Sequence, residues 1–369
     1  MAKDQSTNLS CGIVGLPNVG KSTLFSAITR KKVSAENYPF CTIDPNIGIV
    51  EVADQRLIEL SKLSNSKKTV YATISFVDIA GLVEGASKGE GLGNKFLSNI
   101  RDTDAIIHVV RCFEDEELIH VSGRIDPLSD IETINLELIL SDLQTAENIK
   151  VKLEKKARFT KDKTEMNLID KIIDHLNQNQ VLRLISFTLE EKEFLKNWAF
   201  LTLKKVIYVA NIKEEELNDL ETNKNIQIVK EYTKKENSTL ICISAKIEQE
   251  IATLEPDDAK EFLKELGLKD SGLNQLIKAS FNLLHLISFI TTGEIETRAW
   301  TIVKGTSAKE AAGKIHTDIE KGFIRAEVVS YTDIIQYKGR VQAREAGKAL
   351  SQGKEYIVQD GDVILFFHA

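Results

Sequence analysis

Short apolar runs separated by turns that contain glycine or proline fill the chain from about residue 9 to residue 130. The runs include CGIVG, TISFVDIAG and AIIHVVRCF. Continuous apolar runs of this length, alternating with helical stretches, are typical of buried parallel strands with crossover helices. Similar runs return at residues 204–211 and 238–245, so we expect the same sheet to continue there. The pattern predicts an α/β fold with a mostly parallel sheet and flanking helices.

Between those two halves the apolar residues recur every three or four positions, as on one face of a helix. This spacing runs over residues 136–153 and resumes over residues 166–176, with a charged stretch between them. We expect an antiparallel helical hairpin inserted into the sheet domain. A solvated turn is the simpler interpretation of the charged stretch, and a partner-binding tip is the alternative.

Beyond about residue 284, strand-like runs surround one helical stretch. RAWTIVKG, IRAEVVSY and YIVQDGDVILFFH are predicted strands, and SAKEAAGKIHTDIEKG is a predicted helix capped by Ser307. Asp360 and Gly361 between two apolar runs are a hairpin signal. The sequence therefore predicts a sheet domain, an inserted hairpin and a small C-terminal α/β domain. The expected boundaries are 9–130 with 201–283 for the first, 131–200 for the second and 284–369 for the third.

Composition adds limits rather than new elements. The 369 residues are 42% hydrophobic and 28% charged, and the net charge is −7. A chain of this length buries enough apolar surface to fold without disulfides or a structural metal. Because the molecule as a whole repels nucleic acid, we expect no DNA partner, and any RNA contact requires a local basic patch.

The four cysteines are far apart in sequence and form no C-x-x-C pair, which fits a reducing compartment. No run approaches about 18 apolar residues, so the sequence predicts no membrane span. The N-terminus, MAKDQSTNLS, also lacks the apolar stretch of a secretory signal. We expect a cytoplasmic protein without a membrane partner.

The strongest chemical signal is GLPNVGKST, where Gly15, Gly20, Lys21 and Ser22 satisfy the P-loop pattern G-x-x-x-x-G-K-[ST]. An apolar run precedes it and a helical stretch follows it, as the motif requires. The glycines let backbone N–H groups turn toward an anion, and the following helix directs its positive end at phosphates. Lys21 is then expected to reach the β- and γ-oxygens, and the Ser22 hydroxyl to coordinate Mg²⁺.

A second phosphate-sensing element is the D-x-x-G sequence formed by Asp78 and Gly81, directly after the apolar run TISFV. It places a carboxylate beside the metal and a flexible glycine where a γ-phosphate is sensed. Thr42, in YPFCTIDPN, lies between the two motifs and is a candidate second hydroxyl ligand for Mg²⁺. A loop threonine without a metal role is the alternative.

The stretch expected to read the base departs from the guanine-specific pattern N-K-x-D. Residues 211–214 are N-I-K-E, so glutamate replaces the aspartate and Ile212 replaces the lysine that lies along the base. Loss of the paired carboxylate contact removes about 1–3 kcal/mol of discrimination for guanine. The sequence therefore favours adenine. Backbone amides of Ser244, Ala245 and Lys246, in ISAK, are expected to close the base pocket.

The residue after Gly81 is Leu82, at the position where Ras-like hydrolases carry the glutamine that orients water. The leucine side chain forms no hydrogen bond to water, so hydrolysis must be slow, or be completed by another group or by a partner. The carbonyl of Asn18 is one candidate, because it can hold a monovalent cation against the phosphates. His120 is another, as a water-positioning imidazole, although a structural histidine is the commoner case.

The motifs GLPNVGKST, YPFCTIDPN and FVDIAGLVEGASKGEGLGN, the N-x-x-E stretch and the tail RAWTIVKG…AAGKIHTDIEKGFIRAEVVSY together resemble the YchF-type Obg-like ATPases, within the Obg-related P-loop GTPases. The resemblance extends from Cys11 to the C-terminus. It implies a Ras-like P-loop domain interrupted by a helical hairpin and followed by a C-terminal β-grasp (TGS) domain. It also implies ATP preferred over GTP, slow hydrolysis stimulated by K⁺, and nucleotide-dependent binding to the ribosome, with a link to translation or stress responses.

By position, the resemblance assigns phosphate binding to residues 18–23, Mg²⁺ binding to Ser22 and Thr42, and base contact to N-x-x-E. N-I-K-E differs from the commoner N-V-N-E in its middle residues, which affects base packing. The predicted catalytic residues, with His120 from the argument above, are Lys21, Asp78, Gly81 and His120. The predicted nucleotide-binding residues are Asn18, Val19, Gly20, Lys21, Ser22, Thr23, Asn211, Ile212, Glu214, Ser244 and Ala245.

We therefore expect a monomeric, Mg²⁺-dependent P-loop ATP hydrolase. Its expected partner is the ribosome, through the large subunit or the whole particle, with rRNA as a candidate contact. One alternative is a translation-type GTPase with an unusual base pocket. The other is an RNA or protein adaptor that holds nucleotide as a structural ligand with negligible hydrolysis.

Overall fold

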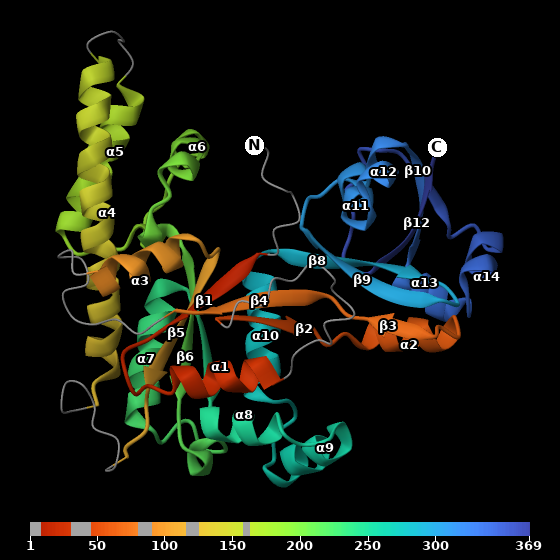
Figure 1. The fold of residues 1–369 in the computed structure, drawn as a ribbon, viewed down its shortest axis with the longest axis horizontal. Helices are drawn as coiled ribbons and strands as arrows, with labels where there is room; N and C mark the ends of the chain where they lie inside the picture. Colours follow the sequence, from red (N-terminus) through yellow and green to blue (C-terminus); the bar gives the residue numbers. More distant parts are fainter. Residues whose placement is uncertain (1–8, 31–45, 80–90, 116–124, 158–162) are drawn as a thin grey trace.

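The structure, a computed structural model, describes residues 9–30, 46–79, 91–115, 125–157 and 163–369. It contains two six-stranded sheets, and a helical hairpin projects from the first of them (Figure 1). Within these described ranges, no helix is both long enough and apolar enough to cross a membrane.

The first sheet has the strand order β2-β4-β1-β5-β6-β7. Its strands are β1 (Ser10–Val14), β2 (Ile47–Glu51), β4 (Thr73–Asp78), β5 (Ala105–Arg111), β6 (Lys205–Asn211) and β7 (Thr239–Ile243). The edge strand β2 pairs antiparallel with β4, whereas the other neighbours are parallel. β5 is buried along its whole length, which explains its continuous apolar sequence. The predicted α/β fold class is confirmed.

Helices pack around this sheet through a shared apolar core. They are α1 (Lys21–Arg30), α3 (Gly91–Arg101), α7 (Lys224–Glu236), α8 (Ala245–Ile251) and α10 (Gly272–Leu283), with α9 (Pro256–Glu265) beyond them. Asn223 and Ser271 accept backbone N–H bonds at the starts of α7 and α10. Such side-chain caps satisfy N–H groups that have no partner within the helix.

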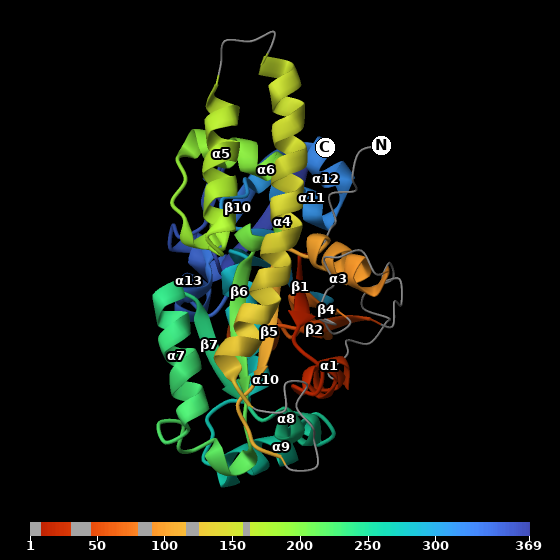
Figure 2. The same cartoon turned by 90° about the vertical axis from the view of Figure 1, so that its left-hand side faces the viewer.

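The inserted unit is built on α4 (Pro127–Ala157) and α5 (Thr164–Asn177), which lie side by side in Figure 2. α4 has 31 residues, which corresponds to a length of about 46 Å. The chain returns through the short helices η3 (Leu182–Leu184), α6 (Leu189–Trp198) and η4 (Leu201–Leu203). Ile139 and Ala146 of α4 pack with Ile169 and Ile172 of α5 in a separate apolar cluster. The predicted hairpin is confirmed; residues 158–162 of its charged turn lie outside the described residues.

The second sheet has the order β11-β10-β12-β8-β9-β3. Its strands are β3 (Lys68–Val70), β8 (Leu286–Thr292), β9 (Glu296–Val303), β10 (Phe323–Ser330), β11 (Leu350–Gln352) and β12 (Asp362–His368). α11 (Ala308–Ile315) packs on the sheet through Ala308 and Ala311, against Phe289 and Ile302. The remaining helices are α2 (Gln55–Leu63), α12 (Thr317–Lys321), α13 (Tyr331–Gln336) and α14 (Arg340–Glu345). A helix packed on a mixed sheet agrees with the expected β-grasp domain.

Two local predictions need correction. The predicted single helix after Ser307 is divided at His316, whose extended backbone (φ −163°) separates α11 from α12. The hairpin predicted at Asp360 and Gly361 is wrong, because β12 pairs with β10 and β8 instead of with the preceding run. Ser307 does cap α11 as expected, in a capping box with Glu310.

Candidate nucleotide-binding site

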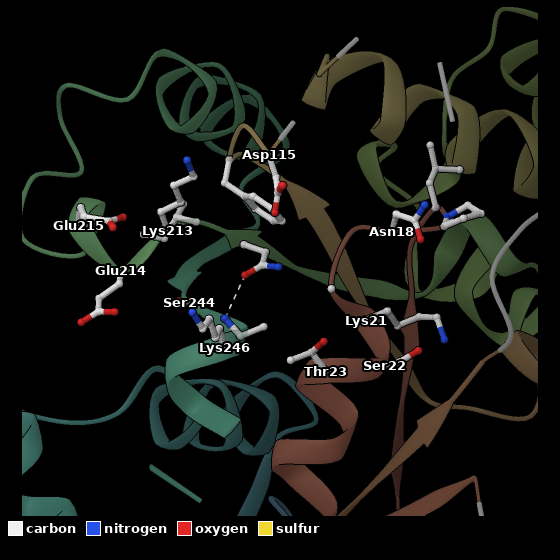
Figure 3. Close-up of a pocket in the computed structure, with 17 residues that line it drawn as sticks. Asn18, Lys21, Ser22, Thr23, Asp115, Lys213, Glu214, Glu215, Ser244 and Lys246 are labelled. Carbon is white, nitrogen blue, oxygen red and sulfur yellow. Dashed lines mark hydrogen bonds between the residues drawn. The ribbon is translucent and has the colours of Figure 1, made fainter. Parts of the chain in front are cut away.

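A cavity of about 790 Å³ lies beyond the carboxyl ends of β1, β5, β6 and β7. Ligands of open parallel sheets bind at this edge, because the loops that follow the strands meet there. The cavity brings together most of the predicted site residues (Figure 3). Those lining it are Asn18, Gly20, Lys21, Ser22, Thr23, Asn211, Ile212, Glu214, Ser244 and Ala245.

The P-loop forms because two of its positions accept only glycine. A Cβ at Gly15 would lie 2.7 Å from the carbonyl oxygen of Val109 on β5. Gly20 has φ +92°, and a Cβ there would lie 2.1 Å from the Asn211 side-chain nitrogen. α1 begins directly afterwards at Lys21, so its N-terminal amides face the cavity. The backbone of the loop therefore has a shape that suits phosphate binding, and the positive end of the α1 dipole lies beside it.

Lys21 and Asp78 form an ion pair between the start of α1 and the end of β4. Lys21 is buried and lines the cavity, whereas Asp78 is not among the lining residues. The backbone N–H of Asp78 donates to the carbonyl of Asn46, 2.8 Å away, just before β2. The backbone of Asp78 is therefore fixed, and its carboxylate holds the Lys21 ammonium group at the P-loop end of the cavity.

Asn211 joins the P-loop to the turn before α8. Its Nδ2 donates to the carbonyl oxygen of Val19 at 2.9 Å, and its Oδ1 accepts from the backbone N–H of Ala245 at 3.0 Å. Both contacts are buried, and each satisfies a backbone group that would otherwise lack a partner. The Ala245 amide is thus bonded to Asn211 here, and its contact with the base stays a prediction. Val19 is buried behind the loop, with its carbonyl directed at Asn211.

The N-x-x-E loop after β6 has an apolar inner side and a charged rim. Ile212 is buried, whereas Lys213 and Glu214 are exposed. The carboxylate of Glu214 points away from the P-loop residues (Figure 3). Glu216 fixes the loop by accepting the Lys213 N–H at 2.9 Å and a hydrogen bond from Asn223 at 2.7 Å.

A wall of the cavity that the sequence interpretation missed comes from the segment after β5. Phe113 and Asp115 line the cavity. The buried guanidinium of Arg111 donates to the carbonyl oxygens of Phe113 (3.1 Å) and Asp115 (3.2 Å) and lies 4.7 Å from the centre of the Phe113 ring. Burial raises the pKa of the neighbouring Cys112 thiol, so it stays protonated. The useful signal was the position of these residues, at the carboxyl end of a predicted parallel strand.

Three predicted site residues, Thr42, Gly81 and His120, lie outside the described residues, as does Leu82. Among the residues that are described, no group of three His, Cys, Asp or Glu side chains is arranged to hold a metal ion. The Ser22 hydroxyl lies on the first turn of α1, next to the Lys21–Asp78 pair. Oxygen donors of this kind suit Mg²⁺ that also binds phosphate, so the residues present fit this ion.

Two parts of the chain match known protein families. Residues 10–151 match the family described as 50S ribosome-binding GTPase. Residues 286–368 match the family YchF-GTPase_C, described as a protein of unknown function (DUF933).

Two bacterial relatives span nearly the whole chain. The chain is 54% identical over 361 residues to the ribosome-binding ATPase YchF of Bacillus subtilis, covering 97% of this chain and 98% of that protein. Identity to the protein of the same name from Escherichia coli O157:H7 is 50% over 358 residues, covering 96% and 98%. A solved structure, the Schizosaccharomyces pombe YchF GTPase, is 40% identical with a TM-score of 0.88 and covers 98% of both chains.

Proposed function

The chain belongs to the YchF family, and on that premise we propose that it is a Mg²⁺-dependent ATPase that binds the ribosome in a nucleotide-dependent manner. One observation carries the nucleotide part of this proposal: the P-loop, the N-x-x-E loop and the turn before α8 surround one cavity. The proposal of ribosome binding rests on the bacterial relatives, which are ribosome-binding ATPases, and it implies a cytoplasmic location.

In this proposal the triphosphate binds at the P-loop end of the cavity. Lys21 contacts the β- and γ-phosphates, while the α1 N-terminus and the backbone amides of residues 18–23 bind the oxygens. Ser22 would hold Mg²⁺, together with Thr42, and the ion would neutralise phosphate charge. Asp78 orients the Lys21 ammonium group through their ion pair. Gly81 is assigned to γ-phosphate sensing.

Preference for ATP is supported by the side chains beside the base end of the cavity. Guanine recognition requires a carboxylate directed at the base edge, whereas Glu214 is exposed and points away from the P-loop. Ile212 offers an apolar surface, and Phe113 adds an aromatic ring to the cavity wall. Without a carboxylate that accepts the N–H groups of the guanine edge, the pocket does not bind guanine more tightly than adenine. Adenine can still stack on the apolar and aromatic side chains of the wall.

Slow hydrolysis follows from the residue after the D-x-x-G motif. Leu82 orients no water by hydrogen bonding, so the attacking water needs another group. We propose His120 as the group that positions this water; as the other candidate, the carbonyl of Asn18 would hold K⁺, which would supply positive charge beside the phosphates. Asn18 has φ +63° and lines the cavity.

The test of the nucleotide site is calorimetry of ATP and GTP binding in the presence of Mg²⁺. We expect ATP to bind more tightly, and Glu214→Asp to shift the preference toward GTP. Glu215→Asp is the matched control, because Glu215 lines the same cavity but lies outside the N-x-x-E pattern. Equal affinities, or tighter binding of GTP, contradict the adenine assignment.

Ribosome binding is tested by co-sedimentation with and without a non-hydrolysable ATP analogue. Lys21→Ala is expected to abolish both turnover and the nucleotide dependence of co-sedimentation. Lys246→Ala removes another lysine of the cavity lining and serves as the control. If phosphate release by the unmodified chain stays at background with Mg²⁺, K⁺ and ribosomes present, the chain is a nucleotide-bound adaptor and no ATPase.

A second candidate function, a GTPase, is favoured by one observation: the solved structure with 40% identity is that of the Schizosaccharomyces pombe YchF GTPase. The same calorimetry separates the two. For a GTPase, Glu214→Asp changes the ratio of affinities little, because the base is then read by other groups.

A further inference from the structure

The segment between β2 and β4 leaves the first sheet and becomes part of the second. It forms α2 and then β3, which pairs in parallel with β9, Lys68 opposite Glu296 and Val70 opposite Arg298. The backbone N–H of Lys67 also donates to the carbonyl of Glu294 at 2.9 Å. The C-terminal sheet is thus completed by a strand from the nucleotide-binding half.

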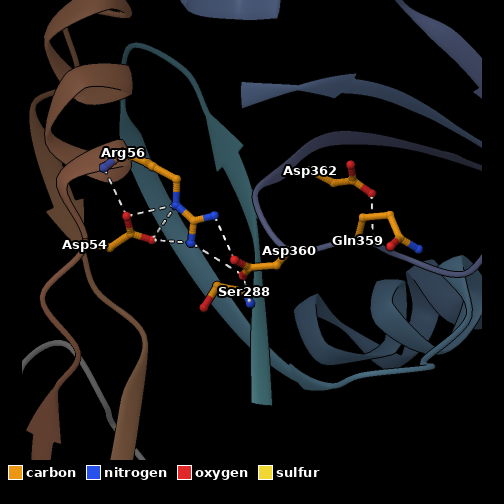
Figure 4. A network of polar contacts seen from close by, with 6 residues as sticks. All are labelled: Asp54, Arg56, Ser288, Gln359, Asp360 and Asp362. Carbon is orange, nitrogen blue, oxygen red and sulfur yellow. Dashed lines mark hydrogen bonds and ion pairs between the residues drawn. The ribbon is translucent and has the colours of Figure 1, made fainter. Parts of the chain in front are cut away.

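Arg56 at the start of α2 fastens this segment to the C-terminal sheet (Figure 4). Its guanidinium lies between two carboxylates, with Nη2 2.8 Å from Asp54 and Nη1 2.8 Å from Asp360. Asp360 also accepts the backbone N–H of Ser288 on β8 at 2.9 Å. The turn is shaped around Arg56, since a Cβ at Gly361 (φ +85°) would lie 2.6 Å from Nη1.

Apolar side chains also join α2 to the C-terminal sheet. Leu57 and Leu60 of α2 are fully buried, and they belong to one core with Ile290 of β8 and Val363 of β12. Glu59 accepts a hydrogen bond from the hydroxyl of Tyr331 at the start of α13. α2 therefore moves with the C-terminal sheet, because separating them exposes apolar surface and breaks charged hydrogen bonds.

The other end of the same segment reaches the phosphate site. β2 and β4 pair antiparallel from Ile47 opposite Val77 to Glu51 opposite Thr73. β4 ends at Asp78, the partner of Lys21. A strand of six residues spans about 20 Å. The β2–β4 ribbon, as we call this edge pair of the first sheet, therefore connects the phosphate site to α2 and the C-terminal sheet, while β4 also pairs in parallel with β1.

We propose that Arg56 is a positioning residue for the nucleotide site, because it fixes the β2–β4 ribbon to the C-terminal sheet and so couples the place of Asp78 to the orientation of that sheet. This inference rests on the proposed nucleotide binding. A nucleotide that moves Asp78 moves the ribbon, and the ribbon carries α2 and the sheet with it. Because coupling between binding sites is reciprocal, a partner that holds the C-terminal sheet changes the relative affinities for ATP and ADP.

The test is the ratio of the affinities for a non-hydrolysable ATP analogue and for ADP, measured by calorimetry on the full chain with Mg²⁺. Arg56→Met keeps the aliphatic stem and removes the bridge, and Asp360→Asn weakens the same bridge from the other side. We expect each variant to change this ratio of affinities at least threefold. Because both substitutions act on the same Arg56–Asp360 bridge, the double variant should change the ratio no more than the more severe single variant does. Arg344→Met is the matched control, since it removes an ion pair to Glu327 between α14 and β10 and leaves α2 and β3 unaltered.

Hydrogen exchange supplies a second readout. In the unmodified chain we expect exchange in β9 and β12 to differ between the ATP-analogue and ADP complexes, and this difference to vanish in Arg56→Met while both nucleotides still bind. Ratios within twofold of the unmodified chain for both variants overturn the inference, as does an equal loss of affinity for both nucleotides. If the unmodified chain binds neither nucleotide, the proposed function fails instead.

Discussion

His108 has a buried imidazole in the middle of β5, and this single side chain makes the stability of the fold depend on pH. It packs beside Tyr208 with ring centroids 5.5 Å apart, and within the described structure its Nε2 has no hydrogen-bond partner. Burial, with a smaller contribution from the nearby Arg183 cation, lowers the pKa of His108 to about 3. Folding therefore requires the neutral imidazole.

The consequence is a loss of stability in mild acid. The unfolded chain takes up a proton on His108 below its ordinary pKa of 6.5, and the folded chain does so only near 3. Stability therefore falls as the pH drops through this window, by about 2 kcal/mol between pH 7 and pH 5. Urea unfolding of His108→Gln is expected to lack this part of the pH dependence, whereas the exposed-site control His368→Gln keeps it. An unchanged pH dependence in His108→Gln contradicts the assignment.

At the residue scale, the sequence predicts the parts of the site that depend on adjacent positions. Gly20, Lys21 and Ser22 follow one another, so their spacing alone defines the phosphate loop. The role of Asn211 depends on how three separate loops meet, and its bonds to Val19 and Ala245 leave no trace in local spacing. For this reason the sequence does not predict the structural role of Asn211 in joining these loops.

At the scale of elements, the helical hairpin is attached to the nucleotide-binding sheet by a buried polar cluster. Arg183 of η3 lies 2.7 Å from Glu236 at the end of α7, and both side chains are at most 7% exposed. Arg183 also donates to Asn135 of α4 at 2.9 Å, and Tyr208 of β6 donates to Glu236 at 2.9 Å. Although burial opposes its ionisation, the hydrogen bonds from Arg183 and its neighbours lower the pKa of Glu236.

Removing one member of this cluster leaves a buried charge without compensation. We expect Arg183→Met to reduce the free energy of unfolding by about 3–5 kcal/mol. The half-exposed pair between Lys150 of α4 and Asp170 of α5 gives the control, because Lys150→Met should cost much less than Arg183→Met. Denaturant unfolding of both variants measures the difference, and equal losses contradict a special role for the cluster.

The elements themselves were predictable where they are long or strongly periodic. α4 and α5 repeat an apolar position every three or four residues, and β5 is a continuous apolar run. β3 has three residues and no pattern that identifies its partner, so its pairing with β9 emerges only in three dimensions. The turn at Asp360 illustrates the same limit, because its carboxylate bonds Arg56, 304 positions away in sequence.

At the scale of the whole molecule, the buried apolar residues of the described part of the chain form three clusters that do not follow the order of the sequence. The largest joins the nucleotide-binding sheet to one face of the C-terminal sheet through Leu57 and Leu60. A second holds the helical hairpin together, and a third lies between α11 and the C-terminal sheet. Cooperative units follow contiguous packing, so α5 and the part of α4 packed against it are able to open without the rest, whereas the first turns of α4 belong to the largest cluster.

This arrangement predicts how far stabilisation by a nucleotide spreads. A nucleotide at 100 times its Kd stabilises the binding-competent state by about 2.7 kcal/mol relative to opened states that do not bind it. Amides that exchange only through such opened states therefore exchange about 100-fold more slowly. We expect this slowing in β1 and β4, and also in β3 and β9, because the largest cluster opens as one unit. Amides of α5 should be little affected, since their cluster opens while the nucleotide stays bound. Hydrogen exchange with a non-hydrolysable ATP analogue measures both, and Lys21→Ala is the control that should show no slowing. Equal slowing of α5 and β1, or none in β9, contradicts this division of the molecule.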